Sequence, residues 1–225
     1  MTSVSEILDA HLVRKAEVGR PALRRWRGSL LGSCIRQQWY SAEGTPITNP
    51  FPSSLYRIFE RGHAVAETLN QAGRAAKEAG DLADFQEEVP LLLEEYDFSG
   101  NADAVVTYPD ETREVWEYKS TTFRGMGYIK SVKPEHAVQA SIYAHILEKE
   151  TGVPHGARVI YATAEDYRLL EFRLDPAWRQ RALRVLRVLQ WYGKRKPPRL
   201  PSRRGKDMKA EFPCKGCQWL KECRG

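Results

Sequence analysis

Two carboxylates and a lysine in the middle of the chain have the chemistry needed to hydrolyse a phosphodiester. Asp103 and Glu117 are hard oxygen ligands of the kind that Mg2+ and Mn2+ prefer, and the backbone carbonyl of Tyr118 can add a third oxygen. A metal held there polarises a phosphate and lowers the pKa of bound water. Lys119 can orient or help to deprotonate that water and offset charge on the phosphate. A Glu-x-Lys triplet alone is most often a weak surface ion pair. Whether these residues form a site therefore depends on the secondary-structure elements that carry them.

The segments that carry these residues are predicted to form an antiparallel hairpin. Residues 97–108, broken near Gly100, and residues 114–119 are extended segments separated by the turn sequence Pro-Asp-Glu-Thr. Side chains alternate along a strand, so Glu117 and Lys119 share one face. The turn brings Asp103 close to them, which places two carboxylates and a lysine in one site.

The elements around the hairpin predict an α/β fold. Ser5 can cap a first helix. A longer helix begins near Ser53 or Ser54, ends by Gly80 and buries apolar residues at three- and four-residue steps. These residues are Leu55, Ile58, Gly62, Val65 and Leu69. The further segments are a strand over 86–93, the hairpin, a helix from Pro134 to about 150, strands over 158–162 and 168–174, and a helix over 176–194.

Four cysteines stand at the two ends of the chain. Cys34 lies near the start, while Cys214, Cys217 and Cys223 lie close together near the other end. The short Cys-x2-Cys loop can place two sulfurs on one ion or cluster. If all four thiolates bind one centre, which zinc or an iron–sulfur cluster could provide, the two ends of the chain must meet. The alternative is four unrelated reduced cysteines.

Charge is unevenly distributed along the chain. Residues 60–120 contain 15 acids and 5 bases, so within a net charge of +6 the rest of the chain carries +16. A polyanion such as DNA would be drawn to the basic flanks and a divalent cation to the acidic middle, although a solvated basic surface is the alternative. The basic residues are Arg14, Lys15, Arg20, Arg24, Arg25, Arg27, Lys194, Arg195, Lys196, Arg199, Arg203, Arg204, Lys206 and Lys209.

Composition and apolar patterning predict a soluble protein. The content of hydrophobic residues is 42%, and no apolar stretch approaches the ~20 residues of a membrane span. The N-terminus lacks an apolar signal core. We therefore expect no membrane partner and a cytoplasmic location, in a prokaryote or a phage-infected host, where thiolates stay reduced. No GxxxxGK[ST] loop is present, so any ATP-driven unwinding would come from a partner.

Several short motifs in order resemble the PD-(D/E)XK nuclease superfamily, and within it the RecB-like and CRISPR-associated exonucleases with a four-cysteine iron–sulfur cluster. The resemblance spans almost the whole chain and includes standalone phage relatives. Its parts are Ser33-Cys34-Ile35-Arg36, Trp39-Tyr40, Arg61-Gly62-His63, Gly100-x2-Asp103, Glu117-x-Lys119, Pro134, Gln139-x3-Tyr143, Pro198-x2-Pro201 and Cys214-x2-Cys217-x5-Cys223.

The resemblance implies a restriction-endonuclease-like αβββαβ core, with a mixed central sheet flanked by helices. It implies that Asp103 and Glu117 ligate Mg2+ or Mn2+, that Lys119 is catalytic, and that Gln139 and Tyr143 form a QxxxY motif one helical turn apart. Packing of Tyr143 in the core is the alternative. It also implies a [4Fe-4S] cluster on the four cysteines that joins the two ends of the chain.

One position departs from the family pattern. Many relatives carry a metal-binding histidine four residues after the helix glycine, where this chain has Ala66. His63 and Glu67 flank that position and are candidate third ligands. Helical spacing places Glu67 opposite the apolar stripe and His63 at its border, which favours a solvated Glu67.

Aromatic residues near the first cysteine are further candidates for contact with DNA. Trp26, Trp39 and Tyr40 lie beside basic residues, and bases can stack on such rings. Packing around a buried cluster is the favoured role of Trp39 and Tyr40.

The sequence thus predicts one nuclease domain over 1–225, with a core at about 53–194 and an iron–sulfur clip formed by 26–40 and 210–225. The expected activity is metal-dependent exonuclease action on single-stranded DNA ends, with a structural cluster. A helicase, CRISPR or recombination protein, or further copies of the chain, could be partners. The alternatives are a catalytically silent DNA-binding module and a zinc-stapled nuclease.

Overall fold

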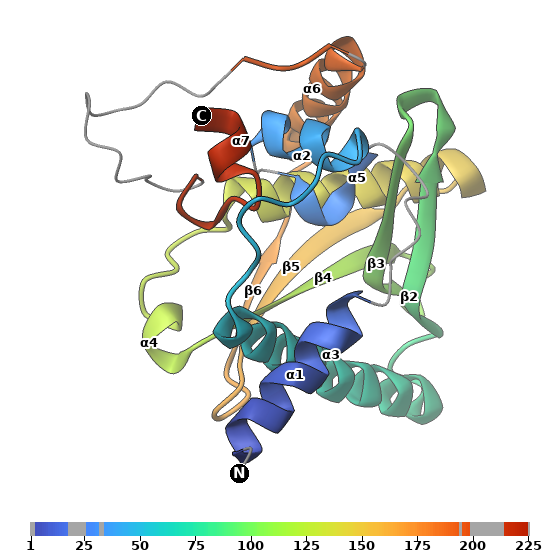
Figure 1. The fold of residues 1–225 in the computed structure, drawn as a ribbon. Helices are drawn as coiled ribbons and strands as arrows, with labels where there is room; N and C mark the ends of the chain where they lie inside the picture. The colour runs from blue at the N-terminus through green and yellow to red at the C-terminus, as the bar shows by residue number, and fades with distance from the viewer. Residues whose placement is uncertain (1–2, 18–25, 32–33, 194, 199–213, 225) are drawn as a thin grey trace.

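The computed structural model describes residues 3–17, 26–31, 34–193, 195–198 and 214–224 (Figure 1). A six-stranded mixed sheet is flanked by helices. The strands are β1 (Trp26–Arg27), β2 (Asp84–Leu93), β3 (Phe98–Thr107), β4 (Arg113–Thr121), β5 (Gly156–Thr163) and β6 (Leu169–Arg173). The α-helices are α1 (Val4–Glu17), α2 (Ile35–Ala42), α3 (Ser53–Ala79), α4 (Phe123–Met126), α5 (Pro134–Thr151), α6 (Ala177–Tyr192) and α7 (Leu220–Arg224).

The order of elements α3-β2-β3-β4-α5-β5 confirms the predicted αβββαβ core. The strands run in the order β1-β3-β4-β5-β6, and β2 also pairs with β3. β3 and β4 form the predicted antiparallel hairpin, whereas β4 and β5 are parallel and are joined through α5. β3 is continuous through Gly100, so the predicted break there is wrong. The short elements β1, α2 and α4 were not predicted.

Helix α3 covers one face of the sheet. Leu69 and Ala66 pack against buried residues of the strands, including Val106 and Tyr118. The helix ends at Gly80, whose φ of 84° is the left-handed conformation that glycine adopts without strain. Ile58 is 47% exposed, contrary to the prediction. The reason is that the first turns of α3 pack against α1 rather than the sheet.

Ion pairs fix α1 on α3. Arg57 of α3 contacts Asp9 of α1 at 2.7 Å, and Lys15 contacts Glu60 at 2.8 Å. The cap of α1 is Ser3 and not Ser5 as predicted, because the Glu6 N–H donates to Ser3 Oγ at 3.2 Å and the Ser3 N–H donates to Glu6 Oε2 at 2.6 Å. This is a reciprocal capping box.

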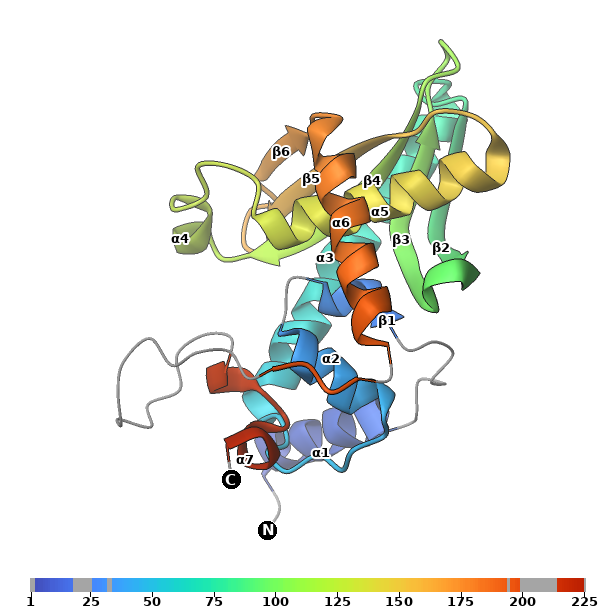
Figure 2. The same ribbon diagram turned by 90° about the horizontal axis from the view of Figure 1, so that it is seen from above.

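The opposite face of the sheet is covered by α5, with α6 packed outside it (Figure 2). α5 begins at Pro134. Proline is tolerated in the first turn of a helix because a backbone N–H at that position has no hydrogen-bond partner within the helix. Most residues of α5 are buried because the helix lies between the sheet and α6. Ile142 and Ile146 are fully buried, as are Leu186 and Leu189 of α6.

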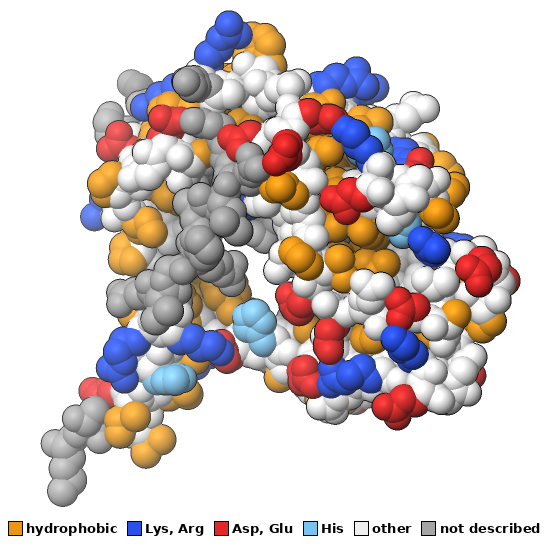
Figure 3. All heavy atoms as spheres, turned by 90° about the vertical axis from the view of Figure 1, so that its right-hand side faces the viewer, with side chains coloured by type: hydrophobic (Ala, Val, Ile, Leu, Met, Phe, Trp, Pro, Cys, Tyr) orange, Lys and Arg blue, Asp and Glu red, His pale blue; other side chains and the backbone are white. Residues whose placement is uncertain are grey.

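The acidic middle of the sequence does not form a uniformly negative surface. On the side that carries β2 and the end of α3, acidic and basic side chains are intermixed (Figure 3). Arg74 of α3 pairs with Glu87 of β2, and Lys77 pairs with Asp84, both at 2.6 Å. These ion pairs neutralise exposed acids. Within the described ranges, no helix has the length and apolar character of a membrane span.

Some predicted features lie outside the described residues. They are the basic residues Arg20, Arg24, Arg25, Lys194, Arg199, Arg203, Arg204, Lys206 and Lys209, together with Ser33, Pro201 and residues 210–213 of the predicted clip.

Candidate active site and cysteine cluster

The candidate active site forms where β3 and β4 separate. Their pairing ends at Ala104 and Trp116, and Asp103 and Glu117 are the next residues on the two strands. The backbone N–H of Tyr118 donates to Asp103 Oδ2 at 2.6 Å instead of to a carbonyl of β3. A carboxylate thus takes the place of a ladder hydrogen bond, which fixes Asp103 beside Glu117.

A chain of hydrogen bonds joins β4 to α5. Lys119 Nζ donates to Glu117 Oε1 at 2.5 Å and to Gln139 Oε1 at 3.2 Å. Gln139 Nε2 in turn donates to the Tyr143 hydroxyl oxygen at 3.1 Å. The structure therefore brings together five predicted site residues that come from two strands and one helix.

The electrostatics of this site favour one retained proton. Burial, together with the neighbouring Asp103 carboxylate, raises the pKa of Glu117 from 4.5 to about 8, although Lys119 opposes the rise. Burial likewise raises the pKa of Asp103 from 3.8 to about 6, against Lys119 and the Tyr118 N–H. Burial alone would lower the pKa of Lys119, but Glu117 and Asp103 outweigh it and the net direction is upward. Lys119 is thus a cation beside two carboxyl groups that resist ionising together.

Tyr143 fills the space between two glycines. A Cβ atom at Gly100 would lie 2.5 Å from the Tyr143 ring, and one at Gly28 would lie 1.9 Å from its hydroxyl oxygen. Both approaches require the absence of a side chain. Tyr143 is therefore packed in the core and also bonded to Gln139, so the two roles considered for it coexist. Gly28 was missed because a lone glycine carries no local signal.

A second polar group adjoins Lys119 and was also missed. Tyr161 of β5 is the register partner of Lys119, and its hydroxyl oxygen lies 2.8 Å from His136 Nδ1. The Lys133 backbone N–H donates to the same oxygen at 3.0 Å. Burial, with the charges of Lys119 and Lys133, lowers the pKa of His136 to about 3, so the imidazole is neutral. His136 precedes Gln139 by three residues on α5, and this spacing places both residues on the same side of the helix. The sequence could therefore have indicated that His136 lies near the site.

The candidate third ligands lie apart from this network. Glu67 is exposed and pairs with Arg74 at 2.8 Å, and Gln71 also donates to it. His63 is exposed. Glu88 of β2 is the other acid whose charge acts on Asp103, and its φ of 51° interrupts the regular pairing of β2 with β3. The exposure of Glu67 agrees with the prediction from helical spacing.

The carboxyl pair suits a hard divalent cation. Glu117 Oε2 is buried and has no hydrogen-bond partner within the described part of the chain, and a metal would satisfy this lone-pair donor. In the same part of the chain, no three His, Cys, Asp or Glu side chains are grouped so that they could hold a single metal ion. The pair would therefore need the Tyr118 carbonyl, water or substrate oxygens to complete a coordination shell.

The four cysteines surround one small cavity, which lies away from the carboxyl pair. Cys34, Cys214, Cys217 and Cys223 line it together with apolar and basic residues of α2 and α7. Burial raises the pKa of the Cys217 thiol, and the three other cysteines add to the rise. All four lie in described segments, and none forms a disulfide. The two cysteine-bearing segments therefore meet, as binding of all four thiolates to one centre would require.

Contacts with α2 and the following loop hold the C-terminal segment in place. Trp219 Nε1 donates to the Thr45 carbonyl oxygen at 2.8 Å, and the Thr48 N–H donates to the Gln218 carbonyl oxygen at 3.0 Å. Tyr40 packs in a buried cluster with Cys217 and Trp219. Packing near the cysteines was the favoured role of Tyr40.

Trp39 also packs against this cluster, which is the role that the sequence favoured for it. Trp26, in contrast, is 1% exposed and belongs to the core cluster, so its prediction as a DNA-stacking residue is wrong. Its place in the two-residue strand β1 explains the burial, because β1 pairs with the start of β3.

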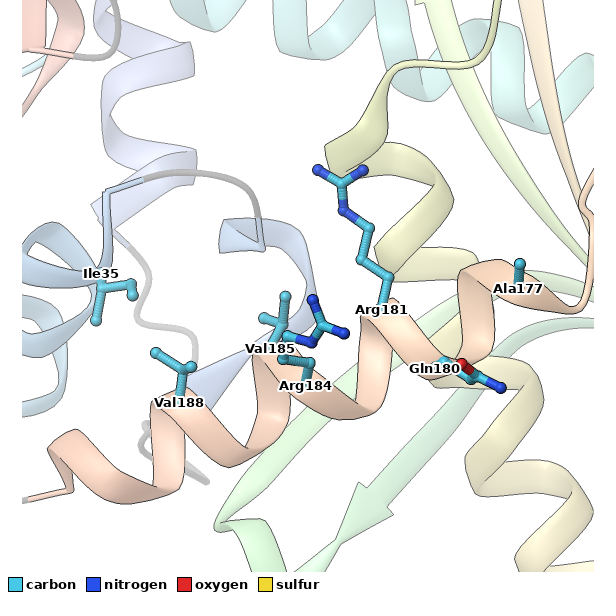
Figure 4. Close-up of a pocket in the computed structure, with 7 residues that line it drawn as sticks. All are labelled: Ile35, Ala177, Gln180, Arg181, Arg184, Val185 and Val188. Atoms are coloured by element: carbon cyan, nitrogen blue, oxygen red, sulfur yellow. The ribbon is translucent and has the colours of Figure 1, made fainter.

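An open groove lies between α6 and the start of α2 (Figure 4). It has a volume of about 460 Å3 and is lined by Ile35, Ala177, Gln180, Arg181, Arg184, Val185 and Val188. None of these residues belongs to the carboxyl network or to the cysteine cluster. The chemistry of the candidate site therefore lies elsewhere.

Comparison with known proteins supports the fold. No family model matches the chain, and no curated protein matches it. The chain is similar to the crystal structure of SSO0001, with a TM-score of 0.54, 17% sequence identity, and coverage of 98% of this chain and 96% of that chain. At this identity the likeness shows a shared fold only. A structure from Eubacterium rectale named "Putative exonuclease" has a TM-score of 0.46 and 12% identity over 84% of each chain, which is too distant to carry an inference.

Proposed function

We propose that this protein is a metal-dependent deoxyribonuclease that hydrolyses phosphodiester bonds, acting as an exonuclease on single-stranded ends. One observation carries the proposal. Asp103, Glu117 and Lys119 share a buried site at the point where β3 and β4 part, and the Gln139–Tyr143 pair supports Lys119 from α5. A surface Glu–Lys pair would have neither the buried carboxyl group nor the partner from another element.

Lys119 is the residue that acts on the nucleophile in this proposal. Its ammonium group is held between Glu117 and Gln139, so its position is fixed before substrate binds. From there it orients the attacking water and offsets negative charge on the phosphate. Gln139 and Tyr143 are positioning residues, because they act through Lys119.

Asp103, Glu117 and the Tyr118 carbonyl would hold Mg2+ or Mn2+. The bound ion would polarise the phosphate and activate water. The unpartnered Glu117 Oε2 and the two neighbouring carboxyl groups support this assignment. His63 stays a candidate third ligand. Glu67 is a weaker candidate, since Arg74 already pairs with it.

We propose further that the four cysteines hold a [4Fe-4S] cluster with a structural role, in a single domain over 1–225. The support is that all four line one cavity and that the segment bearing three of them docks on the loop after α2 through its own hydrogen bonds. A cluster needs four thiolates around a larger core than one ion does. Zinc is the alternative centre, although the described cysteines are not grouped closely enough to hold a single ion. Iron and zinc analysis of protein purified without oxygen separates the two, because a colourless protein with zinc and no iron would exclude the cluster.

The test of the function is a nuclease assay with Mn2+ on single strands labelled at the 5′ or the 3′ end. We expect shortening from one end by the parent protein and no shortening by Lys119→Ala. The matched control is Lys149→Ala, which removes an exposed lysine that pairs with Glu95 and should leave cutting unchanged. Absence of cutting by the parent, or equal cutting by Lys119→Ala, would refute the enzyme.

The second candidate is a catalytically silent DNA-binding module. The observation in its favour is that no group of three ligands forms among the described residues, in keeping with Ala66 at the position where relatives carry a histidine. Such a module would bind DNA in the same assay without shortening it. The hydrogen-bonded network of Glu117, Lys119 and Gln139 favours the enzyme.

A further inference from the structure

Two large aromatic side chains are exposed in the segment that follows β4, the strand that carries Glu117 and Lys119. Phe123 is 53% exposed and Tyr128 is 72% exposed. They belong to residues 122–133, which we call the aromatic loop and which includes α4. Exposed aromatic rings grouped near a site usually mark a binding surface. Figures 1 and 2 both place α4 at the edge of the molecule, where it follows the end of β4.

Both ends of the aromatic loop are fixed beside the candidate active site. The loop begins where β4 ends at Thr121, which pairs with Thr163 of β5. At its other end, the Lys133 N–H donates to the Tyr161 hydroxyl oxygen at 3.0 Å, and Tyr161 is the register partner of Lys119. The loop is therefore tied at both ends to residues that adjoin Lys119.

Internal contacts hold the loop in shape. Thr122 Oγ1 accepts from the Gly125 N–H at 3.0 Å and caps α4. Met126 is buried and anchors the short helix in the core. The guanidinium carbon of Arg168 lies 4.6 Å from the centre of the Phe123 ring. The ring of Phe123 is thus held in place although more than half of it faces solvent.

The charge of the loop suits an anionic ligand. Arg124, Lys130 and Lys133 lie in residues 122–133, which contain no acid. Arg168 adds a fourth positive group, and Asp166, 3.4 Å from it, is the acid paired with it. Aromatic faces with interspersed basic groups are the combination that binds single-stranded nucleic acid, because bases stack on the rings while phosphates meet the cations.

We propose that the aromatic loop is the platform on which unpaired bases of a single-stranded DNA substrate stack as the strand enters the site of Asp103, Glu117 and Lys119. This inference rests on the proposed function. Bases of a duplex are stacked on each other and cannot lie on Tyr128, so the loop gives a physical cause for a preference for single strands. An acidic protein would meet the same charges but would have no use for exposed ring faces.

The test is the affinity for a fluorescein-labelled oligothymidylate and for a blunt hairpin duplex, measured by fluorescence anisotropy with chelator present so that nothing is cut. We expect Tyr128→Ala to bind the single strand roughly 5- to 100-fold more weakly, the range that stacking of one base gives. Binding of the duplex should change by less than about 2-fold, since no stacking is lost. Phe123→Ala should behave in the same way.

Two controls make the result specific. Tyr128→Phe keeps the ring and should bind as the parent does. Trp191→Ala removes another exposed aromatic ring, at the C-terminal end of α6, and should also leave binding unchanged. The Trp191 side chain is 62% exposed, and its ring centre lies 5.2 Å from the guanidinium carbon of Arg195. An unchanged affinity of Tyr128→Ala, an equal loss for duplex and single strand, or an equal loss in Trp191→Ala would overturn the inference.

The proposed function fails in a different way. If the parent and Tyr128→Ala cut and bind alike, only the role of the loop is refuted. If the parent binds single strands through the loop but never cuts with Mn2+, the nuclease is refuted and the platform stands. A parent that neither binds nor cuts refutes both.

Discussion

Replacing Glu117 by glutamine should stabilise the folded protein at alkaline pH in the absence of metal. With Lys119 charged, the site holds one positive group and two carboxyl groups, so ionisation of both carboxyls leaves a buried negative charge. Glu117→Gln removes that excess charge while its amide oxygen can still accept from Lys119. Asp103 then ionises opposite Lys119 and the site becomes neutral.

The magnitude follows from the shifted pKa of Glu117. A carboxyl group whose folded pKa lies above its unfolded pKa binds its proton more tightly when folded, so the free energy of unfolding falls as pH rises from 4.5 toward about 8. At about 1.36 kcal/mol per unit, this shift corresponds to a loss of roughly 5 kcal/mol at pH 9. The shifted pKa already contains the attraction between Glu117 and Lys119, so no separate cost for replacing the charged acceptor is subtracted. We therefore expect Glu117→Gln to be more stable than the parent by roughly 4–5 kcal/mol at pH 9.

The assay is urea unfolding of the parent and Glu117→Gln at pH 5 and pH 9 with chelator. At pH 5 Glu117 is protonated and resembles glutamine, so the two proteins should differ by less than about 1 kcal/mol. The matched control is Glu114→Gln on the same strand. Glu114 is equally buried but pairs with Arg158 at 3.0 Å and Arg173 at 2.7 Å. Burial raises its pKa, but Arg158, with hydrogen bonds from Tyr108 and Trp116, outweighs burial and lowers the pKa.

The control should respond with the opposite sign. Because the folded pKa of Glu114 is lowered, its stabilisation is present above the unfolded value and lost as pH falls through the folded value. Glu114→Gln should thus lose about 3 kcal/mol at pH 9. The reasoning is refuted if Glu117→Gln is no more stable than the parent at pH 9, or if its effect is the same at pH 5.

Three further predictions concern the metal, the cysteines and the glycine beside Tyr143. Mn2+ at pH 8 should raise the thermal midpoint of the parent but not of Asp103→Asn, because an ion that binds only the folded state stabilises that state. An equal rise in both proteins would exclude Asp103 as a metal ligand. Cys34→Ala should lose the bound iron or zinc and make residues 214–224 sensitive to protease. Mass spectrometry after limited digestion measures this, and the same fragments from Cys34→Ala and the parent would contradict the cluster. Gly100→Ala should lose about 1–3 kcal/mol in urea unfolding because its Cβ would overlap the buried Tyr143 ring, while Gly127→Ala, with ordinary contacts at 3.5 Å, should be neutral.

The elements of the core could be predicted because their signals are local. The apolar spacing of α3, the proline that opens α5 and the turn between β3 and β4 each lie within a few residues. The alternation of Glu117 and Lys119 on one face of β4 follows from the strand period alone. The αβββαβ order, the hairpin and the proximity of Asp103 to Glu117 were therefore accessible from the sequence.

The burial of individual residues was less accessible. Ile58 fits the apolar stripe of α3 but is exposed, because the sheet does not reach the first turns of that helix. Trp26 follows a basic segment and reads as a surface residue, yet pairing of β1 with β3 buries it. The spacing of apolar residues predicts which face of a helix or strand is buried. It does not predict how far along that face the neighbouring element extends.

The sequence by itself determined which residues carry the chemistry: a carboxylate on each strand of one hairpin, a lysine on the same face, and four cysteines at the two ends. Only the tertiary structure decided that β3 and β4 part at Asp103, that Tyr143 fits against Gly28 and Gly100, and that the aromatic loop is tied beside Lys119. The physical reason is range. Strand alternation and ligand spacing are set by covalent geometry over a few residues, whereas these three features arise from contacts between segments that are distant in sequence.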